Sequence, residues 1–310
     1  MKAKSIKKVM ASAVVCLFSL SAYSGGGGGG GGDDGLPFPD SCTSNCGYEL
    51  GPNPTLGYVQ ANRGPFSFAS SRVSSSVSGF GGGTIYYPNN VSQELATIAI
   101  APGFTNTQSA VAWWGPVLAS HGFVVITINT NSRFDQPESR GRQLDSALSY
   151  LIDEGNRNNS PISGLVDENR LATMGFSMGG GGALRSAARN RLSASVPLAP
   201  WNIGGNDFDD IGVPTMIMAC ENDGTAPVGI HASPFYNRIP GSTDKALMEI
   251  NNGPHNCANG NNGNNATLST YGVSWMKRFL DKDSRFSQFL CGPNHEANGQ
   301  ISDYRDTCFY

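Results

Sequence analysis

The stretch Gly175-Phe176-Ser177-Met178-Gly179 contains the pattern G-x-S-x-G, and the residues on either side of it decide how it is interpreted. Before it, residues 170–174 form a short, mostly apolar run that is typical of a buried strand. After it, residues 180–189 are small and alanine-rich, and beyond their glycines they indicate a helix. A strand, this pentapeptide and a helix together predict a nucleophile elbow, with the serine on a strained turn near the helix N-terminus. A glycine-rich turn capped by a serine is the simpler alternative, but the flanking strand and helix favour Ser177 as a nucleophile.

Residues 1–50 are predicted to be targeting and linker sequence rather than part of the fold. A basic start is followed by the apolar run 9–20 and by small residues up to position 24, which is typical of a secretory signal peptide and too short for a membrane span. Residues 25–50 begin with an unbroken glycine tract, which cannot bury a core and indicates a flexible tether. We therefore expect a soluble, secreted protein with a catalytic domain at residues 51–310.

Charge and cysteine content exclude several classes of protein. The formal net charge is −3, and loss of the basic leader makes the remainder more acidic, so nucleic-acid binding is not expected. No later segment is long and apolar enough to insert into a membrane. The sequence has only four histidines and no C-x-x-C pair, so we expect no metal site and no cofactor. The cysteines after residue 24 are even in number, which in a secreted protein predicts disulfides of open connectivity: Cys42, Cys46, Cys220, Cys257, Cys291 and Cys308.

Apolar runs of strand length alternate with helical patterns along the chain. Two strands joined by a tight connection come first, and strands and helices alternate from residue 95, so the sequence predicts an α/β fold with a mostly parallel central sheet flanked by helices. The C-terminal segment shows little pattern, so residues 245–250 and 267–280 are expected to be the last strand and the last helix. The expected strands are 66–77, 83–87, 95–100, 123–128, 170–174, 194–196, 213–220 and 245–250, and the expected helices are 109–120, 138–153, 183–189 (after the glycines), 235–239 and 267–280.

A serine nucleophile needs a base, and the base needs a carboxylate that orients it. In the α/β-hydrolase fold these three residues follow the order serine, acid, histidine, each in a loop after a strand. His255 follows the strand ending at residue 250, in a loop able to present an imidazole, and is predicted to be the base. His231 and His295 are interpreted as packing or surface residues.

Asp223 is the predicted acid, because it follows the strand that ends at Cys220. Glu221 lies too early in that turn. Asp207, Asp209 and Asp210 belong to the preceding connection and are interpreted as ordinary solvated loop acids. A bond between Cys220 and Cys257 would tie the acid loop to the base loop, which gives that pairing a physical motive.

Acyl transfer also requires two backbone N–H groups that bind the developing oxyanion. Met178, directly after the nucleophile, is expected to provide one of them. The other should come from the loop Pro102–Thr105 after the strand at 95–100, and Phe104 is the predicted donor. Phe104 could alternatively be no more than a core aromatic residue.

Several short motifs along the chain carry a joint resemblance to one known family. They are Ala101–Thr105, Trp113–Pro116, Ala119–Ile128, Gly175–Gly182, Ala199–Trp201, Cys220–Asp223, His255–Ala258 and Trp275–Phe279. With these motifs, the chain from about Gly51 to the C-terminus resembles the bacterial polyester hydrolases, the cutinase-like enzymes that include the poly(ethylene terephthalate) (PET) hydrolases. The resemblance implies an α/β-hydrolase fold without a lid domain. It also implies a serine esterase that forms an acyl-enzyme and needs no cofactor.

The resemblance also implies roles for residues around the nucleophile. Phe104 and Trp201 would form an aromatic clamp on the substrate, with Met178 beside the scissile ester. The chain departs from common family residues at Phe176, Thr225 and Phe104, and it has a small polar residue, Asn256, at the cleft. His231 and Phe235 match the bulky pair that most cutinases place behind the clamp tryptophan.

The two-disulfide branch of the family has cysteines at the positions of Cys220 and Cys257, followed by an Asn/Gly-rich stretch like 259–265. The resemblance pairs Cys220 with Cys257 and Cys291 with Cys308, which leaves Cys42 with Cys46 as a local staple.

Three other functions stay open at this point. A secreted lipase or small-ester esterase would use the same three residues, as would a less expected peptidase. A catalytically inactive fold used for binding is disfavoured by the intact order of Ser177, Asp223 and His255. We expect a monomer that acts on a polymeric or small ester.

Overall fold

The computed structural model describes residues 48–204, 207–260, 262–296 and 298–308. These residues lie in the second of two compact units into which the chain divides, Asp40–Tyr310. The expected leader and glycine tether, and the expected Cys42–Cys46 bond, lie outside the described residues.

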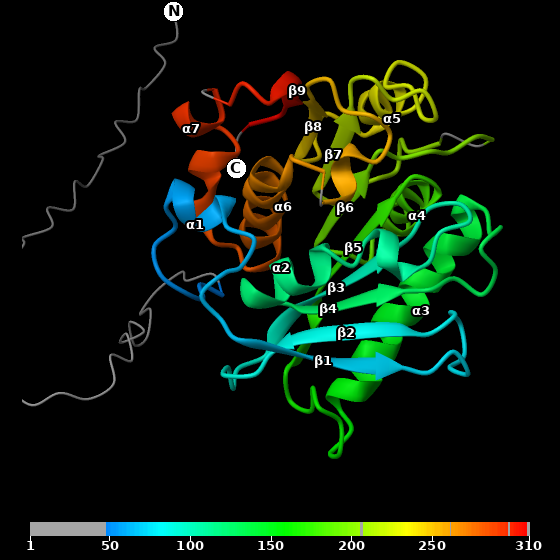
Figure 1. Cartoon of the computed structure of the whole chain (residues 1–310), viewed down its shortest axis with the longest axis vertical. Coiled ribbons are helices and arrows are strands. Elements are labelled where there is room, and N and C mark those ends of the chain that lie inside the picture. Colours follow the sequence, from blue (N-terminus) through cyan, green and yellow to red (C-terminus); the bar gives the residue numbers. More distant parts are fainter. Residues whose placement is uncertain (1–47, 205–206, 261, 297, 309–310) are drawn as a thin grey trace, which may run out of the picture. The chain divides into compact units, whose positions relative to one another are not determined.

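One sheet runs through the described unit, with strand order β1-β2-β4-β3-β5-β6-β7-β8-β9 (Figure 1). Strands β3 to β8 are parallel, whereas β1, β2 and β9 pair antiparallel with their neighbours. This confirms the mostly parallel sheet with a mixed start. The strands are β1 (Phe68–Val73), β2 (Gly83–Pro88), β3 (Leu95–Ala101), β4 (Val124–Ile128), β5 (Val166–Phe176), β6 (Ala194–Leu198), β7 (Thr215–Cys220), β8 (Lys245–Ile250) and β9 (Ile301–Asp306).

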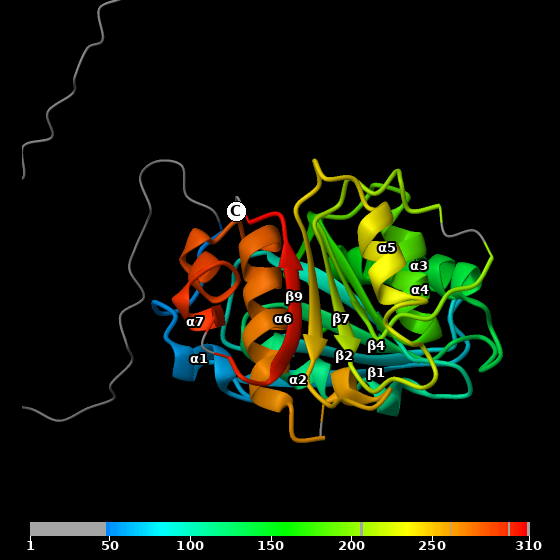
Figure 2. The ribbon, with the colours of Figure 1, turned by 90° about the horizontal axis from the view of Figure 1, so that it is seen from above.

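Helices cover both faces of this sheet, so β3, β4, β6 and β7 are buried along their whole length. Figure 2 shows α3, α4 and α5 on one side of the strands and α6 with α1 on the other. Among the described helices, none is both long and apolar enough to cross a lipid bilayer. The helices are α1 (Leu56–Gln60), α2 (Trp114–Ser120), α3 (Pro137–Gly155), α4 (Met178–Ala187), α5 (Ala232–Arg238), α6 (Asn265–Leu280) and α7 (Pro293–Glu296), with 3₁₀ turns η1 (Gln108–Ala110), η2 (Cys257–Asn259) and η3 (Ser284–Phe289).

The glycine run 179–182 lies inside α4, whereas the sequence analysis placed the helix after these glycines. Each of them allows a close approach of another segment, because an added Cβ would meet an atom at less than 3 Å. The contacts are Gly179 with Ala101 O (2.4 Å), Gly180 with Pro200 Cα (2.9 Å), Gly181 with Trp201 O (2.3 Å) and Gly182 with Arg140 Cβ (2.9 Å). The run therefore lets α4 pack directly against the ends of β3 and β6 and against α3.

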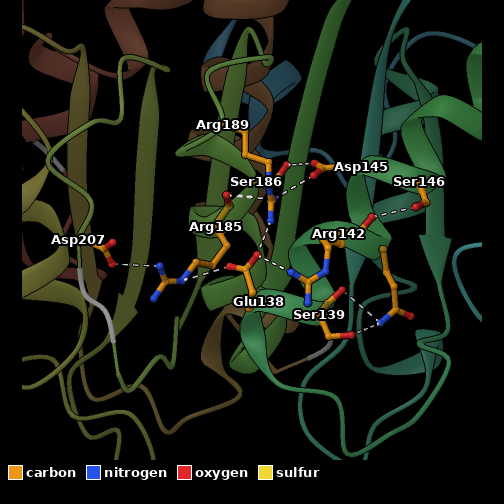
Figure 3. A network of polar contacts seen from close by, with 10 residues as sticks. Glu138, Ser139, Arg142, Asp145, Ser146, Arg185, Ser186, Arg189 and Asp207 are labelled. Atoms are coloured by element: carbon orange, nitrogen blue, oxygen red, sulfur yellow. Dashed lines mark hydrogen bonds and ion pairs between the residues drawn. The ribbon is translucent and has the colours of Figure 1, made fainter.

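Helices α3 and α4 are packed side by side through glycine as well. A Cβ on Gly141 would lie 2.9 Å from the carbonyl oxygen of Gly182. Polar contacts flank this point, where Arg189 donates to both Glu138 and Asp145 (Figure 3). These side chains are partly exposed, so each ion pair contributes only about 0–1 kcal/mol. The close helix contact depends mainly on the glycines.

Helix α2 and strand β5 begin at other residues than the sequence indicates. The expected helix 109–120 begins only at Trp114, and Pro116 lies in its first turn, where the missing N–H costs nothing. Strand β5 begins at Val166 rather than at residue 170, because Val166 already pairs with Leu95 of β3. The polar residues 167–170 lie at an irregularity in the register and carry no apolar pattern.

The strand at 245–250 is not the last one. The segment of little pattern near the C-terminus contains β9, which pairs antiparallel with β8 at the sheet edge. Its charged residues are typical of an edge strand, which avoids pairing with other chains. Helix α7 likewise follows the helix that was expected to be the last.

The glycine contacts predict a stability effect that opposes helix propensity. Alanine at Gly181 should gain about 0.5–1 kcal/mol of helix propensity. The added Cβ would, however, meet the main-chain oxygen of Trp201 at 2.3 Å, which cannot move away alone. We expect Gly181→Ala to lower the free energy of unfolding by about 1–3 kcal/mol in urea titrations. Gly241→Ala, with nothing near the added Cβ, is the control. Equal stability of both variants would contradict this account.

Candidate active site

Ser177 stands on the turn between β5 and α4 with a left-handed backbone, φ 55° and ψ −116°. This conformation is strained for a residue with a Cβ and persists only where the surroundings enforce it. Its N–H donates to Leu198 O at 2.9 Å, and its carbonyl oxygen accepts from Trp201 N at 2.9 Å. The backbone of the loop after β6 therefore holds the serine in place, as the predicted elbow requires.

The structure brings Ser177, His255 and Asp223 into one hydrogen-bonded chain. His255 Nε2 lies 2.9 Å from Ser177 Oγ, and His255 Nδ1 lies 2.7 Å from Asp223 Oδ2. Because an ionised carboxylate can only accept, Asp223 keeps the proton on Nδ1 and leaves the Nε2 lone pair facing the serine. This geometry can deprotonate the hydroxyl for attack on a carbonyl.

Asp223 is buried and receives several donors. Burial alone would raise the pKa of its carboxyl group, but the hydrogen bond from His255 and those from the N–H groups of Ala226 and Thr225 outweigh it and hold the pKa below its usual value. The acid therefore remains ionised at neutral pH and can stabilise a histidine that has taken up a proton.

The other histidines and acids considered in the sequence lie outside this chain of hydrogen bonds. His231 is buried against Trp201 and Phe235, which confirms packing, and burial lowers its pKa. His295 hydrogen-bonds Tyr271. Glu221 is exposed and accepts from the N–H of Asn252, which adds a link between the acid and base loops. The exposed loop acids Asp207 and Asp209 pair with Arg185 and Arg238, and Asp210 is also exposed.

The two predicted oxyanion donors flank the nucleophile. Met178 is the first residue of α4, so its N–H has no acceptor within the helix. Gly103 lies against the serine, since an added Cβ there would be 3.1 Å from Ser177 Cβ. The next residue, Phe104, donates its N–H to no backbone carbonyl in the described ranges. Both amides are thus free to bind an oxyanion.

The residues expected to contact substrate differ in what they pack against. The Phe104 ring is half exposed and packs edge-on against Phe134, with centroids 5.6 Å apart. The Phe176 ring packs against the His255 imidazole at 4.8 Å. Trp201 packs on His231 at 5.9 Å. Thr225 and Asn256 are exposed.

Two of the expected disulfides are present. Cys220 is bonded to Cys257, and Cys291 to Cys308. The first joins the end of β7, three residues before Asp223, to the loop just after His255. In the described ranges, one group of three or more potential metal ligands is found: Cys291, Asp306 and Cys308. The two cysteines are bonded to each other, so the group offers no thiolate to a metal ion.

Sequence reasoning missed two residues of this region, Phe134 and Arg140. Phe134 lies in a short loop with no pattern, and only the fold places it against Phe104. Arg140 was detectable, because it precedes Leu144 by four residues on the apolar face of the helix expected at 138–153. A charged residue on that face signals a buried arginine with specific partners.

Comparisons with known proteins agree with this geometry. The profile of a protein family described as PET hydrolase-like (PETase) matches residues 42–309. The chain is 49% identical to Cutinase est1 of Thermobifida alba over 84% of the chain and 86% of that protein. It is 48% identical to the bis(hydroxyethyl) terephthalate hydrolase of Streptomyces coelicolor, over 84% and 82%. It is 47% identical to Cutinase cut1 of Thermobifida fusca, over 84% and 80%.

The Cys220–Cys257 bond predicts a linked loss of stability and activity. Its sequence separation of 37 residues implies a stabilisation of about 2–4 kcal/mol. We expect Cys220→Ser with Cys257→Ser to lower the melting temperature and kcat on a soluble ester, because the acid and base loops lose their covalent link. Cys291→Ser with Cys308→Ser, remote in sequence from both loops, should lower stability with little loss of kcat. An unchanged melting temperature in the first variant would count against this role.

Proposed function

The chain belongs to the PET hydrolase-like family of carboxylic ester hydrolases, and from this premise we propose that it is a secreted enzyme that cleaves polyesters. The proposed nucleophile is Ser177, with His255 as base and Asp223 as its orienting acid. One observation carries the assignment of these roles: a strained, buried serine is hydrogen-bonded to a histidine that is hydrogen-bonded to a buried carboxylate.

In the first half of the reaction, His255 Nε2 takes the proton of Ser177 as Oγ attacks the ester carbonyl. The carbonyl oxygen becomes an oxyanion, which the N–H groups of Phe104 and Met178 bind. His255 then gives its proton to the leaving alcohol, and an acyl-enzyme remains on Ser177.

In the second half, water replaces the alcohol. His255 deprotonates this water as it attacks the acyl carbonyl, and the same two N–H groups bind the second oxyanion. Collapse of this intermediate returns the proton to Ser177 and releases the carboxylic acid. Asp223 stays ionised throughout and stabilises the imidazolium.

Exposed apolar side chains near the nucleophile support a polymeric substrate. Phe104 and Phe134 are 44% and 66% exposed, and Ile203 and Ile230 are both 65% exposed. They belong to loops that follow the parallel strands β3, β4, β6 and β7. The carboxyl ends of these strands lie at the same end of the sheet as the carboxyl end of β5, which Ser177 follows directly. Within the described ranges no inserted domain covers this edge. The names of the relatives concern cutin and bis(hydroxyethyl) terephthalate, both esters, which is consistent with this proposal.

The proposed export follows from the leader-like residues 1–24 and agrees with the two disulfides, since such bonds persist in oxidising compartments.

We expect the enzyme to release soluble products from amorphous PET film and from an aliphatic polyester, and Ser177→Ala to release none from either. The variant should remain folded, because its backbone bonds to Leu198 and Trp201 do not involve the hydroxyl. Product release is measured by liquid chromatography, with melting curves as the folding control.

The same assay separates the alternatives. Activity on the aliphatic polymer alone would make the enzyme a cutinase-like esterase that rejects rigid aromatic units. Activity confined to triglyceride emulsions or small esters would replace the polyester proposal, and release by Ser177→Ala near the wild-type rate would refute Ser177 as nucleophile.

A further inference from the structure

Arg140 is a fully buried arginine near the proposed active site whose role the reaction scheme leaves open. It lies in the second turn of α3, and its guanidinium donates to three main-chain carbonyl oxygens. These are Asp135 O at 2.7 Å from Nε, Pro102 O at 2.9 Å from Nη1 and Arg133 O at 2.9 Å from Nη2. The acceptors come from two separate loops, one after β3 and one after β4.

The charge of Arg140 is not neutralised by a direct partner. In the described ranges its guanidinium forms no ion pair, and the carboxylate of nearby Asp135 accepts instead from Ser132 N and Gln143 Nε2. Burial lowers the pKa of Arg140 to about 10, and Asp135 partly opposes this effect, so the side chain is charged at neutral pH. Burying a charge without an ion-pair partner is unfavourable, whereas an apolar side chain of similar size would pack there without that desolvation cost. Packing alone therefore does not explain an arginine at this position.

Two of the three carbonyl oxygens bound by Arg140, Pro102 O and Arg133 O, hold the loop that carries Phe104. Pro102 O is held between Arg140 Nη1 and α4, where a Cβ on Gly179 would lie 2.5 Å from it. On the other side of Phe104, Thr105 N donates at 2.9 Å to Arg133 O, the same oxygen that accepts from Arg140 Nη2. Thr105 has a left-handed φ of 60°, so this end of the loop is strained and needs such a constraint. The Phe104 amide thus lies between two anchors that converge on one guanidinium.

We infer that Arg140 is a positioning residue for ester hydrolysis: its guanidinium fixes the loop 102–105 so that the Phe104 N–H points at the oxyanion. This inference rests on the proposed function. Hydrogen bonds from a charged donor are stronger than neutral ones, and the planar guanidinium holds its donors in fixed directions toward two loops, whereas the donors of a lysine sit on one flexible point charge. The oxyanion donor is then in place before the transition state forms, at no cost of reorganisation.

The first test compares Arg140→Met with the wild type on a soluble p-nitrophenyl ester, well below the melting temperature of either protein. Because the oxyanion contact strengthens only in the transition state, kcat should fall about 100-fold while KM stays within about twofold. Arg142→Met is the matched control, two residues along the same helix with an exposed side chain, and should keep wild-type kinetics. A folded Arg140→Met enzyme with wild-type kcat would overturn the inference.

Two further variants keep the inference testable if Arg140→Met does not fold. Arg140→Lys retains the charge but lacks the rigid fork that directs separate donors at the two loops, so its kcat should also fall with little change in KM; wild-type kcat in this variant would refute the positioning role. In Arg140→Ala, guanidinium ions at low, non-denaturing concentration should restore kcat severalfold, whereas sodium ions should not. Failure of guanidinium to restore kcat in a folded Arg140→Ala enzyme would likewise count against it. Failure of the proposed function would look different, since the wild type itself would then lack Ser177-dependent esterase activity.

Discussion

The left-handed backbone of Ser177 is the constraint on which the rest of the site depends. A residue with a Cβ does not hold φ 55° unless its neighbours enforce it. Here Leu198 and Trp201 bind its main chain, and Gly175 and Gly179 let β5 and α4 meet at the turn, where a Cβ on Gly175 would lie 2.2 Å from Gly179 O. The buried sheet and α4 enforce this strained turn, and its effect is to place the Ser177 hydroxyl at the carboxyl ends of the strands, within hydrogen-bond distance of His255 Nε2.

The topology explains why residues far apart in sequence meet at this hydroxyl. Parallel strands bring their carboxyl ends to one edge, so the loops after β3, β7 and β8 supply the Phe104 amide, Asp223 and His255. Loops alone are mobile, and each of these is tied down by a different interaction. The Cys220–Cys257 disulfide joins the loops of the proposed acid and base, and Arg140 binds the loop of the proposed oxyanion donor. The loops that carry Asp223, His255 and Phe104 are therefore each held in place around the strained Ser177.

Much of this arrangement could be predicted from the sequence, because local patterns determine it. G-x-S-x-G between a strand and a helix located Ser177, and the order of loops after strands located Asp223 and His255, which the structure brings within hydrogen-bond distance. Two features that depend on tertiary contacts, strand β9 and the start of helix α4, were not predicted. Strand β9 has no apolar pattern because it is an exposed edge, and its pairing with β8 is long-range. The start of α4 was misplaced because glycines usually interrupt helices, and only the neighbouring carbonyl groups reveal why they stand inside this one.

The most direct test is covalent labelling by an organophosphonate, which reacts rapidly with an activated serine and mimics the tetrahedral intermediate. Intact-mass and peptide analysis should find a single adduct on Ser177 of the wild type, formed quickly, and a strongly slowed reaction in His255→Ala. This result would establish that Ser177 is the nucleophile and that His255 activates it. An adduct on another residue, or equal labelling rates in the two proteins, would contradict it.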